Sequence, residues 1–436
     1  MKTEEGLIRA VGVRGLTAGI VNYTIGAGIF VLPAIVAGKV GNAAPVIYVI
    51  CAIAMGLIVL CFAEAGSRIS LSGGTYAYAG LAFGPYAGFM VAMCLWFGSA
   101  VLASAAVANV FVDALAQLSP VFANSAVRAA IIIATYSALL VINIRGVKIG
   151  STVVQTVTAG KLLPLIVLVV FGAFAVNKAN LAWTGLPPTS DIARTTVMLI
   201  FAFLGVESAL TPSGEVRDPA RTVPRSIFLA LAITTILYIA IQVVSQGVLG
   251  PELATSTKAP LAETARKAFG DGGRFLILVG AAISTFGYVA GDMLAAPRGI
   301  YALGKDGLLP TWIGRVHEKY ATPYIAITFH AVLCAIFALT GSFASLVVLA
   351  VLATLVVYLI CCLATIELRR KNIRTEASVP FRVPGGAAVP ILASAIIIWL
   401  MTSSTLQEVR AMAIFLAVLT VIFLAMRMRR TPAPTL

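Results

Sequence analysis

Long runs of apolar residues, separated by short polar breaks, repeat along the whole chain. A helix of about 20 apolar residues crosses the roughly 30 Å hydrocarbon core of a bilayer. The runs are too long for the strands of a membrane barrel, which alternate over about 10 residues. We therefore predict an all-α integral membrane protein with twelve transmembrane helices. The predicted spans are residues 15–40, 43–67, 84–115, 124–144, 152–176, 192–212, 226–249, 272–302, 322–340, 343–366, 387–405 and 410–427.

Two of the predicted spans contain interruptions. Gly26-Ala27-Gly28 lies near the middle of the first span, and Gly205, followed by Thr211-Pro212-Ser213-Gly214, lies toward the end of the sixth. A single glycine in a membrane helix most often serves close helix packing. Two interrupted helices five spans apart instead match an inverted repeat of five plus five helices, in which helices 1 and 6 are discontinuous.

A helix that breaks within the bilayer must line a cavity, because lipid cannot satisfy the exposed N–H and carbonyl groups. Exposed N–H groups favour a carboxylate, and exposed carbonyls favour an ammonium group. The two breaks therefore predict a zwitterionic ligand such as an amino acid. No linker separates a second domain, so we expect one transporter domain over 1–436, with helices 1–5 at about 12–176, helices 6–10 at about 192–366 and helices 11–12 at about 387–427.

The composition supports this membrane class. The 436 residues are 60% hydrophobic and only 11% charged, and the net charge is +14. With both termini placed in the cytoplasm, most of the 31 Lys and Arg residues fall on the cytoplasmic side, as the positive-inside rule requires. We therefore expect a multi-pass protein of the inner cell membrane, and the basicity requires no nucleic acid partner.

Cysteine and histidine give no sign of a metal site or of a cofactor. The two histidines are His317 and His330. The six cysteines lie in apolar spans without metal-ligand spacing and are interpreted as small buried apolar side chains. They are Cys51, Cys61, Cys94, Cys334, Cys361 and Cys362.

Several short motifs follow one another between about Gly12 and Arg427. They are Gly26-Ala27-Gly28-Ile29-Phe30, Glu64-Ala65-Gly66-Ser67-Arg68, Ser72-Gly73-Gly74-Thr75-Tyr76, Phe201-Ala202-Phe203-Leu204-Gly205-Val206-Glu207-Ser208, Glu215-Val216-Arg217-Asp218-Pro219 with Pro224-Arg225, and Pro297-Arg298 followed by Asp306-Gly307-Leu308-Leu309-Pro310. Together they resemble signatures of the amino acid-polyamine-organocation superfamily. The resemblance implies the LeuT fold, with two inverted five-helix repeats, two trailing helices and substrate held at the breaks in helices 1 and 6.

The resemblance also implies which residues contact the substrate. They are Gly26, Ala27 and Gly28 in helix 1, and Phe201, Leu204 and Gly205 in helix 6. Arginine/agmatine exchangers of the family carry tryptophan where this chain has Phe201 and Asp292. Phe201 keeps an aromatic gate but lacks the N–H donor of tryptophan, and the departure at Asp292 speaks against arginine/agmatine exchange itself.

Other polar residues within the spans are candidates because charges at membrane depth are costly. Glu207, beside the helix 6 break, either staples the broken segment or takes up a proton. Asp292 shares a helical face with Tyr288 and Thr285, and it either faces the cavity and favours cationic cargo or pairs with an internal cation such as Lys161. Ser99 in helix 3 lines the pocket or packs between helices. Glu64 and Arg68 lie four residues apart and are interpreted as a structural pair.

Lys161 is predicted to lie near the middle of the bilayer, where its ammonium group needs a partner inside the protein. The family resemblance implies that this lysine stands where sodium-coupled relatives bind a cation, bridging helix 1 to helix 8. It then acts either as a proton carrier or as a permanent cation that replaces sodium.

The function that these observations imply is secondary active transport of amino acids by alternating access, independent of sodium, with proton coupling or exchange. The alternative is an exchanger of polyamines or other organic cations. A channel and a membrane-embedded enzyme are remote alternatives, because the sequence lacks a filter-like segment and the motifs of a catalytic or ATP-binding site. The expected partners are the amino acid or amine substrate, protons and the bilayer, and the sequence leaves the oligomeric state open.

Overall fold

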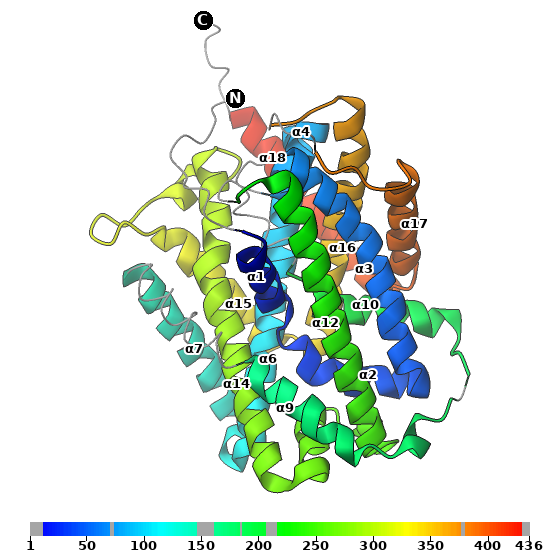
Figure 1. The fold of residues 1–436 in the computed structure, drawn as a ribbon. Helices are drawn as coiled ribbons and strands as arrows, with labels where there is room; N and C mark the ends of the chain where they lie inside the picture. The colour runs from blue at the N-terminus through cyan, green and yellow to red at the C-terminus, as the bar shows by residue number, and fades with distance from the viewer. Residues whose placement is uncertain are drawn as a thin grey trace, which may run out of the picture.

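The computed structural model describes residues 12–69, 74–145, 161–183, 185–205, 216–375 and 380–429, and within these ranges the regular elements are helices (Figure 1). This confirms the predicted all-α class. The α-helices are α1 (Val13–Thr24), α2 (Gly28–Val40), α3 (Ala44–Arg68), α4 (Thr75–Phe83), α5 (Pro85–Cys94), α6 (Ala103–Leu118), α7 (Ser125–Arg145), α9 (Leu162–Gly172), α10 (Thr189–Phe203), α12 (Pro219–Leu249), α13 (Glu252–Thr255), α14 (Pro260–Lys305), α15 (Tyr324–Thr340), α16 (Phe343–Arg370), α17 (Ala388–Thr402) and α18 (Leu406–Arg429). The shorter elements are η1 (Gly41–Ala43), the π-helix η2 (Leu95–Leu102), η3 (Pro120–Ala123), η4 (Ala173–Ala175), η5 (Lys178–Leu181) and η7 (Thr311–Gly314).

Seven segments among the described residues are long and apolar enough to cross a membrane. They are Gly28–Arg68, Pro85–Leu118, Ser125–Arg145, Ala220–Leu249, Pro260–Lys305, Phe343–Arg370 and Leu406–Met428. Three shorter apolar helical segments, Leu162–Ala175, Tyr324–Thr340 and Ala388–Thr402, accompany them. The chain is therefore a multi-pass membrane protein.

Burial separates central from peripheral spans. In the most apolar window of each span, 78% of residues are buried for Pro85–Leu118 and 72% for Phe343–Arg370. The value is only 17% for Ser125–Arg145 and for Leu406–Met428. Figure 1 shows the first of these peripheral helices, α7, at one edge of the bundle. Large apolar side chains exposed on such helices suit contact with lipid rather than water.

The predicted interruption of the first span is confirmed. Helix α1 ends at Thr24 and α2 begins at Gly28, so Ile25, Gly26 and Ala27 form a non-helical break between them. Helix α10 ends at Phe203, inside the sixth predicted span. Leu204 and Gly205 follow it, and the rest of that span, including Glu207, lies outside the described residues.

A π-helical segment interrupts the third span. The wider π turn of η2 lies between α5 and α6 and packs against α16. A Cβ placed on Gly98 would lie 2.3 Å from the Cβ of Ala353, so this contact requires a glycine. π-Helical turns often accompany functional sites, and η2 contributes Ser99 to the cavity described below.

The eighth predicted span began at residue 272, and the structure gives the reason. Helix α14 is continuous by its hydrogen bonds but contains non-helical angles at Phe269 and Gly270, where Gly270 has φ 80°. The kink separates a short amphipathic segment from the membrane-spanning part that carries Tyr288 and Asp292.

The Glu64–Arg68 pair is confirmed, and it belongs to a larger ion cluster. Glu64 is fully buried, and its Oε1 accepts hydrogen bonds from Arg68 Nε at 3.1 Å and Nη2 at 3.0 Å. Arg369 of α16 donates to both carboxylate oxygens, and the backbone N–H of Val383 donates to Oε2 at 2.8 Å. One carboxylate thus joins α3, α16 and the segment before α17.

We expect Glu64→Gln to lower the free energy of unfolding by about 3–5 kcal/mol, because it leaves two packed guanidinium groups without their counter-charge. The measurement is thermal unfolding of the purified protein in detergent. The matched control is Arg370→Gln, which removes one partner of an ion pair that is 74% exposed on the arginine side. Its expected cost is below about 1 kcal/mol. Equal destabilisation by the two substitutions would contradict the assignment.

Candidate functional site

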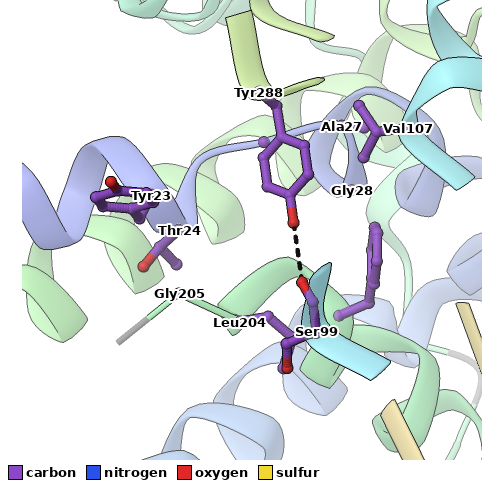
Figure 2. Close-up of a pocket in the computed structure, with 11 residues that line it drawn as sticks. Tyr23, Thr24, Ala27, Gly28, Ser99, Val107, Leu204, Gly205 and Tyr288 are labelled. Carbon is purple, nitrogen blue, oxygen red and sulfur yellow. Dashed lines mark hydrogen bonds between the residues drawn. The ribbon is translucent and has the colours of Figure 1, made fainter. Parts of the chain in front are cut away.

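A cavity lies where the first span is broken and α10 ends. The space in and at the mouth of the cavity, open solvent included, is about 430 Å³. Its lining comes from α1, the break, α2, η2, α6, α10 and α14 (Figure 2). The lining residues are Tyr23, Thr24, Gly26, Ala27, Gly28, Ser99, Val107, Phe201, Leu204, Gly205 and Tyr288. The structure therefore brings together every predicted substrate-contacting residue except Asp292 and Glu207, the latter lying outside the described residues.

The glycines of the cavity allow two helix ends to approach closely. A Cβ on Gly28 would lie 3.1 Å from the Cα of Ala202 and 3.2 Å from the ring of Phe201. Gly205 has φ +121°, and a Cβ there would lie 2.9 Å from the carbonyl carbon of Tyr23. Few residues other than glycine adopt this backbone conformation. The ends of α1 and α10 meet in the cavity wall for this reason.

Lys161 contacts the first carbonyl that the break releases. In an unbroken helix the carbonyl of Asn22 would accept the N–H of Gly26, four residues later. Here the Gly26 N–H donates to Thr24 O at 2.9 Å, and the ammonium group of Lys161 donates to Asn22 O instead. Lys161 is 8% exposed. It lies toward helix 1 as predicted, although its carbonyl partner precedes the Gly26–Gly28 stretch.

Tyr238 of α12 contacts both the end of α1 and the end of α10, and it was not among the predicted site residues. Its hydroxyl lies 2.8 Å from Ala202 O and 3.1 Å from Thr24 O, close enough to donate to either carbonyl. The side chain is fully buried. A tyrosine inside an apolar span is an ordinary residue by sequence alone, since its partners are backbone atoms of distant helices.

Helix ends of opposite polarity surround the cavity. The N-terminus of α2 begins at Gly28, and the first N–H groups of any helix lack partners within that helix. The C-termini of α1 and α10, at Thr24 and Phe203, present carbonyl groups. The partial positive charge of the first end favours a carboxylate, and the partial negative charges of the others favour an ammonium group.

Hydroxyl groups supply the other polar contacts of the cavity. Tyr288 points across it, and its hydroxyl donates to the carbonyl of Ser99 at 3.4 Å (Figure 2). The hydroxyl of Ser99 lies 2.7 Å from that of Thr354 on α16, so Ser99 both lines the cavity and joins two helices. None of the described residues in the lining carries a charged side chain.

Four lining residues were absent from the predicted site. Tyr23 and Thr24 directly precede the break, and this adjacency was an available signal. For Tyr288 the sequence predicts only a place on the same polar helix face as Asp292. Val107 of α6 carries no sequence signal, because an apolar residue in an apolar span is uninformative.

Asp292 is not part of the described lining, in contrast to the prediction that it faces the cavity. Its carboxylate oxygen Oδ2 lies 2.8 Å from His330 Nε2 on α15. The suggested pairing with Lys161 is not observed either, because the described ion contact of Asp292 is with His330. A tyrosine occupies the cavity position on α14, one helical turn before Asp292.

Comparisons with known proteins give a family and several relatives that are named as transporters. The family model described as amino acid permease matches residues 11–430. The methylthioribose transporter of Bacillus subtilis is 28% identical over 96% of this chain and 93% of its own length. An uncharacterized transporter of Mycobacterium tuberculosis is 29% identical, covering 88% of this chain and 85% of its own, and another is 30% identical over 69% and 67%.

We expect Tyr238→Phe to lower the free energy of unfolding by about 1–3 kcal/mol, because it removes a buried donor from the carbonyls of Thr24 and Ala202. The matched control is Tyr48→Phe. The Tyr48 ring lies 6.5 Å from that of Tyr238, and its buried hydroxyl has no hydrogen-bond partner among the described residues. Removing that hydroxyl should leave stability unchanged or raise it. Thermal unfolding in detergent measures the two effects, and the assignment fails when the control loses as much stability as Tyr238→Phe.

Proposed function

Because the chain belongs to the amino acid permease family, we propose that it is a secondary transporter of a small amino acid with an uncharged side chain. The observation that carries this proposal is the meeting of one helix N-terminus and two helix C-termini around a single cavity. A zwitterion offers a carboxylate to the first and an ammonium group to the others. Substrate contacts are assigned to Gly26, Ala27, Gly28, Phe201, Leu204 and Gly205, with Ser99 and Tyr288 beside them.

The lining favours neutral cargo. The described residues around the cavity offer hydroxyl groups, aromatic rings and small apolar side chains, and none is a carboxylate. Among the described lining residues, a polyamine or a cationic side chain finds no counter-charge, and an unpaired charge is costly within a membrane.

Methylthioribose is the second candidate cargo. One observation favours it: the similarity to a protein named methylthioribose transporter extends over 96% of this chain. The hydroxyl groups of the cavity suit an uncharged polar molecule. The two candidates differ in how they interact with the helix ends. A zwitterionic amino acid has a charge for each polarity, whereas a neutral molecule has none.

The transport mechanism that we propose is alternating access by one domain of twelve spans in the inner membrane, with both termini cytoplasmic and two inverted five-helix repeats. Transport then draws on a gradient or on exchange rather than on catalysis. Lys161 takes the role of a coupling cation, because its ammonium group donates a hydrogen bond to the carbonyl of Asn22, which the break in helix 1 releases. This role is compatible with sodium-independent transport.

Counterflow into sodium-free proteoliposomes tests the cargo. Vesicles loaded with unlabelled substrate should take up the labelled form of a small neutral amino acid, and the uptake should saturate. A panel of alanine, leucine, lysine, putrescine and methylthioribose separates the alternatives. Uptake of lysine or putrescine in preference to alanine and leucine would overturn the neutral-cargo proposal, and uptake of methylthioribose alone would select the second candidate.

We expect Lys161→Ala to reduce uptake at least about tenfold, equivalent to roughly 1.4 kcal/mol, while the protein still inserts and purifies normally. The reason is the loss of the donor to Asn22 O beside the cavity. The matched control is Lys178→Ala in η5, an exposed lysine that should leave uptake unchanged. Strict sodium dependence of the unmodified protein, or full activity of Lys161→Ala, would contradict the proposed role.

A further inference from the structure

Three side chains behind the cavity form a hydrogen-bonded chain that the proposed transport cycle does not yet use. The indole Nε1 of Trp96, on η2, donates to Nδ1 of His330 at 3.1 Å. The other ring nitrogen, Nε2, lies 2.8 Å from Oδ2 of Asp292 on α14. Trp96 is 7% exposed and His330 is fully buried. The chain thus joins η2, α15 and α14 inside the protein.

The chemistry of indole fixes the form of the imidazole. An indole N–H donates and never accepts, so Nδ1 of His330 must be the unprotonated nitrogen. The ring is then the neutral tautomer with its proton on Nε2, and it donates that proton to the carboxylate of Asp292. The chain therefore runs in one direction, from Trp96 through His330 to Asp292.

The same tautomer argues against a metal ion at this place. Asp292, His330 and Cys334 bring a carboxylate oxygen, a ring nitrogen and a thiol sulfur within 4.8 Å of one another, as a ligand set would. A metal ion binds a ring nitrogen through its free lone pair, however, and the indole already occupies the lone pair of Nδ1. Nε2, the nitrogen that faces Asp292 and Cys334, carries the proton.

The chain runs beside a second connection between the same two helices. Tyr288 and Asp292 lie one turn apart on α14, while Ser99 and Trp96 lie three residues apart on η2. Tyr288 reaches Ser99 directly, across the cavity. Asp292 reaches Trp96 through His330. Displacement of Trp96 therefore moves the segment that also forms the Ser99 wall of the cavity.

We propose that His330 is the proton-binding site of the transporter, and that a proton and the indole of Trp96 compete for Nδ1. The incoming proton bonds to the lone pair of Nδ1, so the ring becomes an imidazolium with N–H groups at both nitrogens. It can then no longer accept from Trp96, whereas its bond to Asp292 becomes a charge-assisted pair. Binding of the proton therefore breaks the hydrogen bond that holds Trp96 of η2 to His330. This inference rests on the proposed transport function.

The surroundings identify His330 as the group that responds. The titratable neighbours of the His330–Asp292 pair are Cys334 on α15, Tyr136 on α7, Tyr23 on α1 and Tyr288 on α14. Thiols and phenols ordinarily titrate well above neutral pH, unlike imidazole. Among the described residues, Asp292 forms no ion pair with a lysine or arginine. The part of the chain that the structure describes therefore gives the pair no cation in place of the proton.

The direct test uses the fact that the chain has two histidines. In full-length protein carrying His317→Gln and labelled with ¹⁵N-histidine, His330 is the single labelled ring. We expect one protonated and one unprotonated nitrogen at high pH, with Nδ1 the unprotonated one, and two protonated nitrogens at low pH. The reverse tautomer, or a ring that stays in one form between about pH 5 and 9, would overturn the proposal.

The coupling to η2 needs a second reporter. With Trp183, Trp312 and Trp399 replaced by Phe, the emission of Trp96 should change with pH over the range in which His330 titrates. His330→Gln supplies an amide that accepts from indole and donates to Asp292 without titrating, so it should flatten this response. Cys334→Ser is the matched control and should retain the response. A pH response that survives His330→Gln would contradict the competition.

Transport then separates this inference from the proposed function. The two spectroscopic tests need no cargo, so they stand even when counterflow fails to identify a substrate. With a cargo in hand, His330→Gln should retain counterflow but lose accumulation driven by an inward proton gradient. Equal proton-driven accumulation by His330→Gln and the unmodified protein would overturn the coupling role while leaving the transporter assignment intact.

Discussion

The structure depends on how the carbonyl groups released by a helix break are satisfied inside a membrane. Lipid offers no donors, so each released carbonyl requires one from the protein. The N–H of Gly26 donates to the carbonyl of Thr24, and the ammonium group of Lys161 donates to the carbonyl of Asn22. The hydroxyl of Tyr238 lies within hydrogen-bond distance of the carbonyls of Thr24 and Ala202. These donors come from different parts of the chain, which fixes how the surrounding helices pack against the break.

The same constraint shapes the cavity. Because the donors hold these helix ends, the backbones approach until only glycine fits. Gly28, the first residue of α2, packs against the end of α10, and Gly205, just after α10, packs against the end of α1. The space that remains is bounded by backbone on one side and by Tyr288, Ser99 and their helices on the other. The described lining therefore offers oriented backbone dipoles and hydroxyl groups rather than charged side chains. Such groups respond to how charge is distributed over a ligand.

The sequence predicted what depends on local pattern. Apolar runs predicted the all-α multi-pass class, and Gly26 to Gly28 predicted the break in the first span. The family resemblance supplied Phe201, Leu204 and Gly205 of the lining. The sequence left two positions open for Asp292, the cavity or an internal partner, because residues four apart share a helix face only approximately. Tyr288 meets the cavity, while Asp292, about 6 Å further along the axis, contacts His330 of α15. Tyr238 and His330 were missed because their partners lie on distant elements. The π turn of η2, which sets the directions of Trp96 and Ser99, breaks the 3.6-residue period that such reasoning assumes.

Two buried basic side chains, Lys161 and His330, form hydrogen bonds of opposite direction with elements of the cavity wall. The direction decides how protonation affects each contact. Lys161 donates to the carbonyl of Asn22, and an amine still has N–H groups after losing a proton, so that contact weakens without disappearing. His330 accepts from Trp96, and the lone pair that accepts is the one a proton occupies, so that contact is either present or absent. A change of protonation at Lys161 therefore adjusts the strength with which α1 is held. A change at His330 makes or breaks the contact between α15 and η2, so this side chain can act as a proton-dependent switch while the helix ends at the cavity stay as they are.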